Sequence, residues 1–125
     1  MPEIVFYKDT KGREPVYEFM RELEKKNDKN SRVHLNKIND DIQVLRLHGT
    51  DGARITKTMK HLDGDIWELR PIDNRILFGA WFEDVFILLH VFVKKTQKTP
   101  AAEIRKAKEE LEDFKERFGE NREQG

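Results

Sequence analysis

The 125-residue chain has no cysteine, no apolar run long enough to span a bilayer, and no excess of charge of either sign. Without cysteine it can form neither a disulfide nor a zinc site built on thiolates. The short apolar runs exclude a transmembrane helix, and the start Met-Pro-Glu lacks the features of a signal peptide. We therefore expect a soluble, cytoplasmic protein with no membrane association. A net charge of +0 also argues against binding nucleic acid through bulk positive charge alone.

Charge is nevertheless distributed unevenly along the chain. Residues 94–108 contain six basic side chains and one acidic side chain, whereas residues 109–125 contain seven acidic and three basic ones. The basic part begins with Lys94, Lys95 and Lys98, directly after a nine-residue apolar run. Lysines crowded at the end of a strand indicate a surface that faces an anion, and a phosphate-bearing polymer is the first candidate. The alternative is a solvated helix on which charges segregate by chance.

The apolar pattern predicts one α+β domain, with an antiparallel sheet, an N-terminal helical hairpin, and a C-terminal helix packed on one face. The expected elements are a strand over 3–8, a helix from Pro15 to a break at 27–30, a helix from Ser31 to Gly49, a short strand near 55–59, strands over 66–72, 75–82 and 85–93, and a helix that begins at Thr99 and Pro100. We expect this domain to cover residues 1–118 and to be followed by a frayed acidic tail over 119–125.

Turn lengths predict which side chains share a face of the sheet. A two-residue turn at 83–84 puts Arg75 and His90 on the same face, and an even-length loop after Arg70 adds that residue to them. The opposite face is apolar throughout, so we expect the helices to cover it as the core. Its members include Trp67, Phe78 and Leu89.

Arginines and a histidine on one face suit the cleavage of RNA without a metal. Such cleavage needs a base for the ribose 2′-hydroxyl, cations for the pentacovalent phosphorane, and an acid for the leaving 5′-oxygen. Arg70 and Arg75 can bind phosphate through two N–H groups each, and His90 can act as base or acid near neutral pH. Acidic side chains are sparse around this set, which disfavours a two-metal mechanism, so we expect no metal or other cofactor. Further positive charge for RNA binding can come from Lys57, Lys60, Lys94, Lys95 and Lys98.

Two structural alternatives stay open for these residues. Like charges that lie close across strands are unfavourable by a few tenths of a kcal/mol to ~1 kcal/mol unless an anion lies between them. That anion can be a substrate phosphate, or it can be Glu68 or another acidic side chain that neutralises one arginine. His90, in turn, can be a hydrogen-bonded histidine of a central strand with no catalytic role.

Several segments of the second half of the chain resemble one protein family. They are Gly64-Asp65-Ile66-Trp67-Glu68-Leu69-Arg70, Asn74-Arg75-Ile76, Val85 to His90, Lys94 to Pro100, and Glu103-Ile104 with Ala107. In this order they resemble the RelE/ParE superfamily of toxins from type II toxin–antitoxin systems, and most of all its phage-derived, HigB-like branch. The resemblance covers residues 57–110 by motif, whereas residues 1–50 agree in element order alone.

The resemblance implies a RelE-like fold and the activity of an mRNA interferase, a metal-independent endoribonuclease that cuts mRNA on the ribosome and so inhibits translation. By motif, Arg70 matches the arginine of the family's Trp-Glu-Leu-Arg segment, and Arg75 matches the arginine that opens the next strand. Lys57, Lys60 and His61 lie in a variable basic segment before it. The resemblance also implies a cognate antitoxin, commonly a helix-turn-helix protein, in a toxin–antitoxin hetero-oligomer.

The sequence departs from the family pattern at one point. Many ribosome-dependent members place a catalytic tyrosine or histidine near the C-terminal end of the domain, whereas the tyrosines of this chain are Tyr7 and Tyr17. The proton donor is therefore not identified by the resemblance. Two other functions stay open, a ParE-like poison of DNA gyrase and a catalytically inactive protein-binding module of the same fold.

Overall fold

The computed structural model describes the main chain of residues 2–124 and the side chains of residues 2–119. Its elements are β1 (Glu3–Phe6), α1 (Pro15–Lys26), α2 (Lys29–His48), the 3₁₀ helix η1 (Gly49–Arg54), β2 (Met59–Asp63), β3 (Ile66–Leu69), β4 (Asn74–Trp81), β5 (Val85–Val93) and α3 (Ala101–Gln124). The α+β class predicted from the sequence is confirmed. Most of the predicted tail, 119–125, lies outside the described side chains, so the domain boundary stays a prediction.

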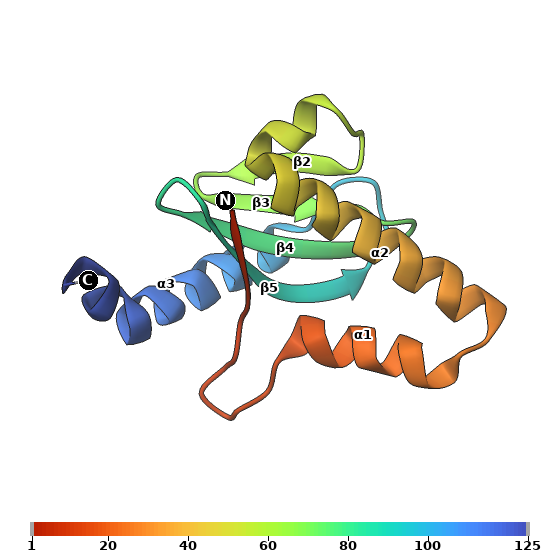
Figure 1. Ribbon diagram of the computed structural model, residues 1–125, viewed down its shortest axis with the longest axis horizontal. Helices are drawn as coiled ribbons and strands as arrows, with labels where there is room; N and C mark the ends of the chain where they lie inside the picture. Colours follow the sequence, from red (N-terminus) through yellow and green to blue (C-terminus); the bar gives the residue numbers. More distant parts are fainter. Residues whose placement is uncertain (1, 125) are drawn as a thin grey trace.

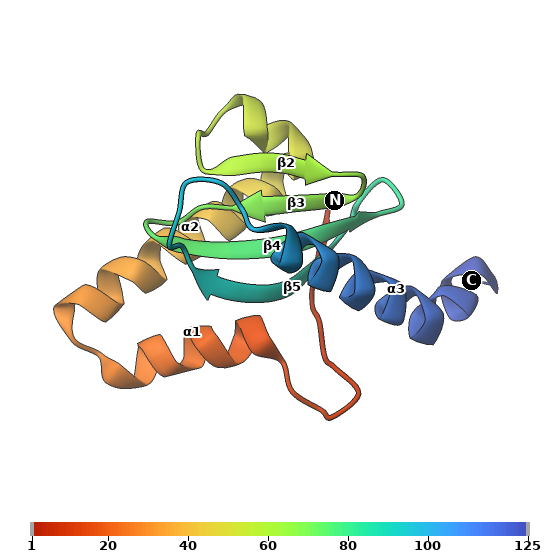
Figure 2. The same ribbon diagram turned by 180° about the vertical axis from the view of Figure 1, so that it is seen from behind.

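The strands form one mixed sheet in the order β1-β5-β4-β3-β2. The predicted meander of β3, β4 and β5 is present, but β1 pairs parallel to β5, so the sheet is not purely antiparallel. Figures 1 and 2 show α1 and α2 on one face of the sheet and α3 across the other. The sequence placed one core face under the helices, and the structure adds a second, because α3 packs on the face that carries the predicted site.

Local capping explains where the two N-terminal helices begin and end. Pro15 occupies the first turn of α1, where a missing N–H costs nothing. The helix ends at Asn27, whose φ of 50° is left-handed. Asp28, rather than the predicted Ser31, caps α2, because its carboxylate accepts a 2.8 Å hydrogen bond from the Ser31 N–H. Gly49 ends α2 with a φ of 58°, which a residue with a Cβ rarely adopts.

Two apolar clusters fill the two interfaces between helices and sheet. The cluster between α1, α2 and the sheet consists of Val16, Ile38, Ile42, Leu45, Met59, Leu69, Ile76, Phe78, Phe86 and Leu88. The cluster between α3 and the sheet consists of Tyr7, Ile66, Leu77, Val85, Ile87, Leu89, Ala107, Leu111 and Phe114. Full burial of one large apolar side chain contributes about 1.5 to 3 kcal/mol, so each cluster is large enough to hold its helices against the sheet.

The β4–β5 turn is one residue longer than the sequence predicted. Trp81 pairs with Val85, so the turn contains three residues, 82–84. Phe82 takes up the reversal with a left-handed φ of 55°. A β-bulge compensates for the shift, because the pair of Leu77 and His90 is followed directly by the pair of Phe78 and Leu88 and leaves Leu89 unpaired.

The bulge decides which side chains share a face. Away from the turn the predicted register holds, and Glu68, Leu77 and His90 are cross-strand neighbours on the α3 face. Arg75 lies two residues before Leu77 and therefore projects from the same face, as predicted. Leu89 does not follow the prediction: it packs with Leu77 under α3, and not on the face of Trp67 and Phe78.

Candidate functional site

A pocket of about 450 Å³ opens between β2, the segment that follows β5, and the first turns of α3. Three of its lining residues, Lys60, Arg70 and Lys98, were predicted from the sequence to bind phosphate or RNA. We call it the basic pocket. Its full lining is Lys60, His61, Leu62, Arg70, Gln97, Lys98, Thr99 and Ile104.

Glu68 joins two walls of the basic pocket from beneath. Its side chain is 0% exposed. One carboxylate oxygen, Oε1, accepts a 2.6 Å hydrogen bond from Arg70 Nε, and the other, Oε2, accepts a 2.6 Å bond from the Thr99 hydroxyl. A buried carboxylate is costly unless its oxygens are paired, so these two contacts keep Glu68 where it is. Of the alternatives that the sequence left open, the one in which Glu68 pairs with an arginine is the one observed.

Arg70 is fixed at two points and still reaches the pocket. Its Nε contacts Glu68, and its main-chain N–H donates a 2.7 Å bond to the Thr58 carbonyl. The side chain is 21% exposed. Among the described residues, none forms a hydrogen bond with Nη1 or Nη2. The part of the guanidinium that could bind an anion is therefore unoccupied by protein groups.

The segment between β5 and α3 brings Lys98 and Thr99 to the pocket. The sequence predicted that Thr99 caps the last helix, but its hydroxyl donates to Glu68, and α3 starts at Ala101. The carbonyl of Pro100 accepts the first helical hydrogen bonds, at 3.0 and 3.3 Å. Thr96 closes the segment on itself through a 2.8 Å bond from its hydroxyl to the Lys98 carbonyl. The sequence showed no signal for the link from Thr99 to Glu68, because the two residues are 31 positions apart.

Arg75 does not line the basic pocket. It is 5% exposed, and its Nη1 donates to the carbonyls of Ile72 at 3.2 Å and Asn74 at 2.8 Å. These bonds close the β3–β4 turn, in which Ile72 has a left-handed φ of 64°. Burial, and after it the positive charge of Arg70, lowers the pKa of the Arg75 guanidinium from its usual value. Arg75 thus lies behind Arg70 and adds positive charge there without facing the pocket.

His90 is enclosed between β5 and α3. It is 2% exposed, with Nδ1 at 2.5 Å from Glu110 Oε1 and Nε2 at 3.1 Å from Glu103 Oε1. Both ring nitrogens are thus occupied by carboxylates of α3. His90 shares the sheet face of Arg70, as predicted, but it does not line the basic pocket.

The remaining predicted RNA-binding lysines surround the basic pocket without lining it. Lys57 is exposed just before β2, Lys94 and Lys95 follow β5, and the Lys94 N–H donates to the Asp73 carbonyl at 2.8 Å. His61 lies opposite Trp67 in the β2–β3 pairing, and the two rings contact each other at an interplanar angle of 53° with centroids 4.7 Å apart. Its imidazole therefore belongs to the face of the sheet opposite Glu68, although the residue borders the pocket.

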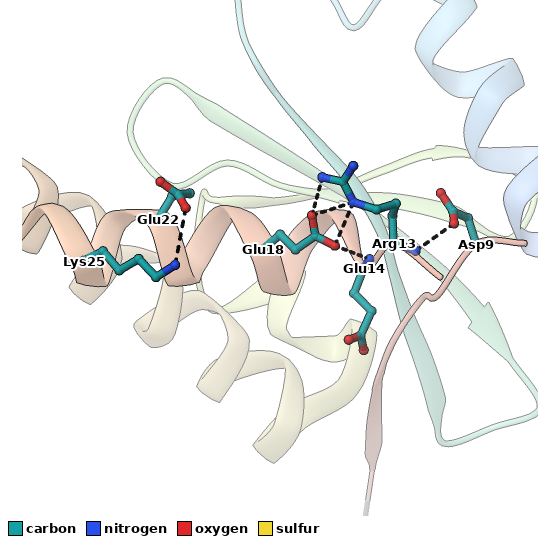
Figure 3. Close-up of polar contacts among 6 residues, drawn as sticks. All are labelled: Asp9, Arg13, Glu14, Glu18, Glu22 and Lys25. Carbon is teal, nitrogen blue, oxygen red and sulfur yellow. Dashed lines mark hydrogen bonds and ion pairs between the residues drawn. The ribbon is translucent and has the colours of Figure 1, made fainter. Parts of the chain in front are cut away.

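A larger groove of about 850 Å³ runs along α1 and reaches Val91 of β5. Figure 3 shows that its charged side chains largely pair with one another. Arg13 Nη2 lies 2.6 Å from Glu18 Oε1, and Lys25 Nζ lies 3.9 Å from Glu22. The hydrogen bond from Arg13 holds the pKa of the Glu18 carboxyl below its usual value. Because Arg13 and Lys25 already pair with carboxylates and the lining includes Glu18 and Glu22, this groove offers less to an anion than the basic pocket does.

The part of the chain that the structure describes has neither a cluster of metal-binding side chains nor a helix that could cross a membrane. None of its His, Asp and Glu side chains form a group of three or more that could hold a metal ion. None of the helices found there is both long and apolar enough to cross a membrane.

Comparison with known proteins found one family model that matches the chain. The family model described as phage derived protein Gp49-like (DUF891) matches residues 18–112, which is most of the chain. The match includes β2 to β5, the segment with Lys98 and Thr99, and the first half of α3. A search of curated proteins found no match.

Proposed function

The chain belongs to the phage-derived Gp49-like family, and from this membership and the basic pocket we propose that it is a type II toxin that cleaves mRNA on the ribosome. The family is consistent with a toxin-like protein. The observation that carries the proposal of RNA cleavage is the convergence of Lys60, Arg70 and Lys98 on one pocket. The described lining of that pocket contains no acidic side chain. Such a pocket favours a phosphodiester over a neutral or cationic ligand.

In the proposed reaction the scissile phosphate lies against the free edge of the Arg70 guanidinium. The ribose 2′-hydroxyl loses its proton and attacks phosphorus, and the 5′-oxygen leaves with a proton, so the products are a cyclic phosphate and a free 5′-hydroxyl. Arg70 stabilises the charge of the phosphorane, with Lys60 and Lys98 beside it. His61 also borders the pocket, but its ring lies against Trp67, so we assign proton transfer to the amines of Lys60 and Lys98.

The other predicted site residues have supporting roles in this proposal. Arg75 raises the positive potential behind Arg70 and holds the β3–β4 turn. His90 holds α3 on the sheet, since direct proton transfer to RNA would first require the release of Glu103 or Glu110. The lysines outside the pocket, Lys57, Lys94 and Lys95, guide the RNA backbone toward it. The toxin needs no metal or other cofactor for this chemistry.

We further propose that the partner of the toxin is a cognate helix-turn-helix antitoxin, which blocks activity in a toxin–antitoxin hetero-oligomer by covering the helices or the basic face. Its gene is expected beside that of the toxin. Co-expression of the two should restore growth and give a complex that co-purifies.

Cleavage of an mRNA on purified ribosomes tests the function. We expect the protein to cut the message with no divalent metal beyond what the ribosomes need, and Arg70→Ala to reduce the rate by about 10²- to 10³-fold, the loss typical of a donor that stabilises a developing oxyanion. Arg46→Ala is the matched control, because Arg46 is an exposed arginine of α2 on the far face of the sheet.

Pulse labelling in cells separates this function from its rivals. Expression should lower protein synthesis first. An early fall in DNA synthesis with translation intact would favour a poison of DNA gyrase. Growth that continues without either change would favour a catalytically inactive binding module.

A further inference from the structure

We propose that Glu68 is the positioning residue of the basic pocket: it orients the Arg70 guanidinium and fixes the pocket wall that carries Lys98. This inference rests on the proposed function, because it assigns Glu68 a part in the turnover of the same site. Glu68 would touch neither RNA nor the reacting atoms. It would act entirely through Arg70 and Thr99.

The manner of contact between Glu68 and Arg70 supports positioning over simple neutralisation. An arginine that is neutralised by a carboxylate commonly donates two parallel N–H bonds to it. Here the bond runs from Nε alone, at 2.6 Å, so the outer edge of the fork stays available to the pocket. A bond to Nε also restricts rotation of the guanidinium plane. Arg70 is therefore preorganised for an anion that approaches from the pocket.

The second oxygen of Glu68 holds the opposite wall of the basic pocket, through Thr99. Thr99 is 7% exposed, and its hydroxyl donates to Oε2 at 2.6 Å. Thr99 directly follows Lys98, whose carbonyl is bound by Thr96. One buried carboxylate thus links β3, which precedes Arg70, to the segment that presents Lys98. A site assembled from two segments needs such a link, because a misplacement of 1 Å can cost about 10²-fold in rate.

A positioning role and a merely electrostatic role predict different changes in turnover, although both predict RNA binding that is not weakened. Glu68 places a negative charge beneath a site that would bind phosphate. If that charge were its whole contribution, Glu68→Gln would bind RNA more tightly and cleave it at least as fast. If Glu68 positions Arg70 and Thr99, the same variant should bind RNA equally well or more tightly and yet turn over more slowly. The split between binding and turnover therefore identifies the role.

The decisive experiment compares Glu68→Gln and Thr99→Val with the unchanged toxin. Glutamine keeps the volume of the side chain but has one acceptor oxygen in place of two, so it can accept from Arg70 Nε or from the Thr99 hydroxyl but not from both. Thr99→Val removes the hydroxyl bond with the carboxylate retained. We expect kcat on ribosome-bound mRNA to fall roughly 10- to 100-fold for Glu68→Gln, and less for Thr99→Val, with the Kd for a non-cleavable 2′-deoxy RNA analogue unchanged or lower. Glu18→Gln is the control, because it breaks an arginine–glutamate pair on α1.

An unaltered kcat, or losses of kcat and of affinity to the same extent, would overturn the inference. If Glu68→Gln does not fold, as judged by circular dichroism, the Thr99→Val variant decides alone.

A second measurement does not depend on RNA cleavage. The Nε–H proton of Arg70 should exchange slowly with water in the unchanged toxin and faster in Glu68→Gln, whose single neutral amide oxygen is a weaker acceptor, as followed by nitrogen-15 NMR. Equal rates in both proteins would refute the positioning of Arg70. If the exchange rates differ but the unchanged toxin does not cleave RNA, the geometry holds and the proposed function fails.

Discussion

His90 Nδ1 and Glu110 Oε1 lie 2.5 Å apart, and this contact joins the central part of the sheet to α3. On the other side of the ring, Nε2 lies 3.1 Å from Glu103. Each ring nitrogen of His90 is therefore within hydrogen-bond distance of a carboxylate of α3. Because α3 also carries the residues that follow Thr99, the histidine indirectly supports the basic pocket.

Replacing His90 by alanine should therefore lower the stability of the protein. The change removes the ring that both Glu103 and Glu110 contact, and a buried polar group left without its hydrogen-bond partner typically costs about 1 to 3 kcal/mol. We expect a value at the low end, since the Glu103 side chain is 29% exposed. Urea unfolding gives the free energy.

The variant with both His90→Ala and Glu110→Gln should recover part of that loss, because it removes one of the two like charges. If His90→Ala abolished cleavage with full stability, the histidine would have a catalytic role and not a structural one.

Arg70→Lys should lower the rate of RNA cleavage almost as much as Arg70→Ala does. A lysine keeps the charge, but it lacks the planar fork that binds Glu68 through one edge and a phosphate through the other. We expect kcat on ribosomes to fall by about 10²-fold, with a weaker effect on RNA affinity. Lys60→Arg is a suitable comparison, because Lys60 offers a point charge that arginine can replace. A fully active Arg70→Lys would show that the charge alone suffices at this position.

The sequence predicted the site in part, and particular residues show where the prediction stopped. The alternation of strands placed Arg70, Arg75 and His90 on one face, and the pairs near Arg75 confirm this. It did not predict that Arg75 and His90 are buried, because that depends on α3 packing over them. The sequence did contain one indication of this burial. Leu77 pairs with His90 and lies two residues after Arg75, and an apolar side chain at that position indicates a buried face.

The error at Leu89 has a different origin. A β-bulge adds one residue to a strand and leaves no mark in the apolar pattern, since Leu88 and Leu89 are both leucine and either could face the core. The three-residue turn, in which Phe82 has a left-handed φ, could not be predicted from the sequence either, because glycine or asparagine usually marks such a conformation. Contacts between distant segments, such as the bond from Thr99 to Glu68, cannot be derived from periodicity at all.

Gly79→Ala should destabilise the packing of α3 on the sheet. A Cβ at position 79 would lie 2.6 Å from Leu111 Cδ1 and 2.9 Å from Leu111 Cδ2, so Leu111 must move. Overpacking of this kind typically costs 1 to 3 kcal/mol, and we expect about 1.5 kcal/mol because a leucine side chain can partly rearrange. Thermal unfolding measures the loss. Gly64→Ala separates this effect from that of backbone strain, since Gly64 has a φ of 57° and no atom near the added Cβ.

The stability of the protein should fall in acid in part through Asp113. Its Oδ2 accepts hydrogen bonds from the Tyr7 hydroxyl at 2.6 Å and from Arg117 Nη2 at 2.7 Å. The bond from Tyr7, followed by that from Arg117, holds the pKa of Asp113 below its usual value. A depressed folded-state pKa adds stability above the unfolded-state value of about 3.9, and that stability is lost as the pH falls through the folded-state pKa.

Asp113→Asn should therefore be less stable than the unchanged protein at pH 7, and the difference should shrink as the pH falls below the unfolded-state pKa and toward the folded-state pKa. Guanidinium unfolding at a series of pH values measures both proteins. Glu112→Gln is the matched control, because Glu112 is the carboxylate next to Asp113 in the chain and is exposed. A difference between Asp113→Asn and the unchanged protein that stays constant from pH 7 to pH 3 would mean that the Tyr7 and Arg117 contacts do not favour the ionised carboxylate.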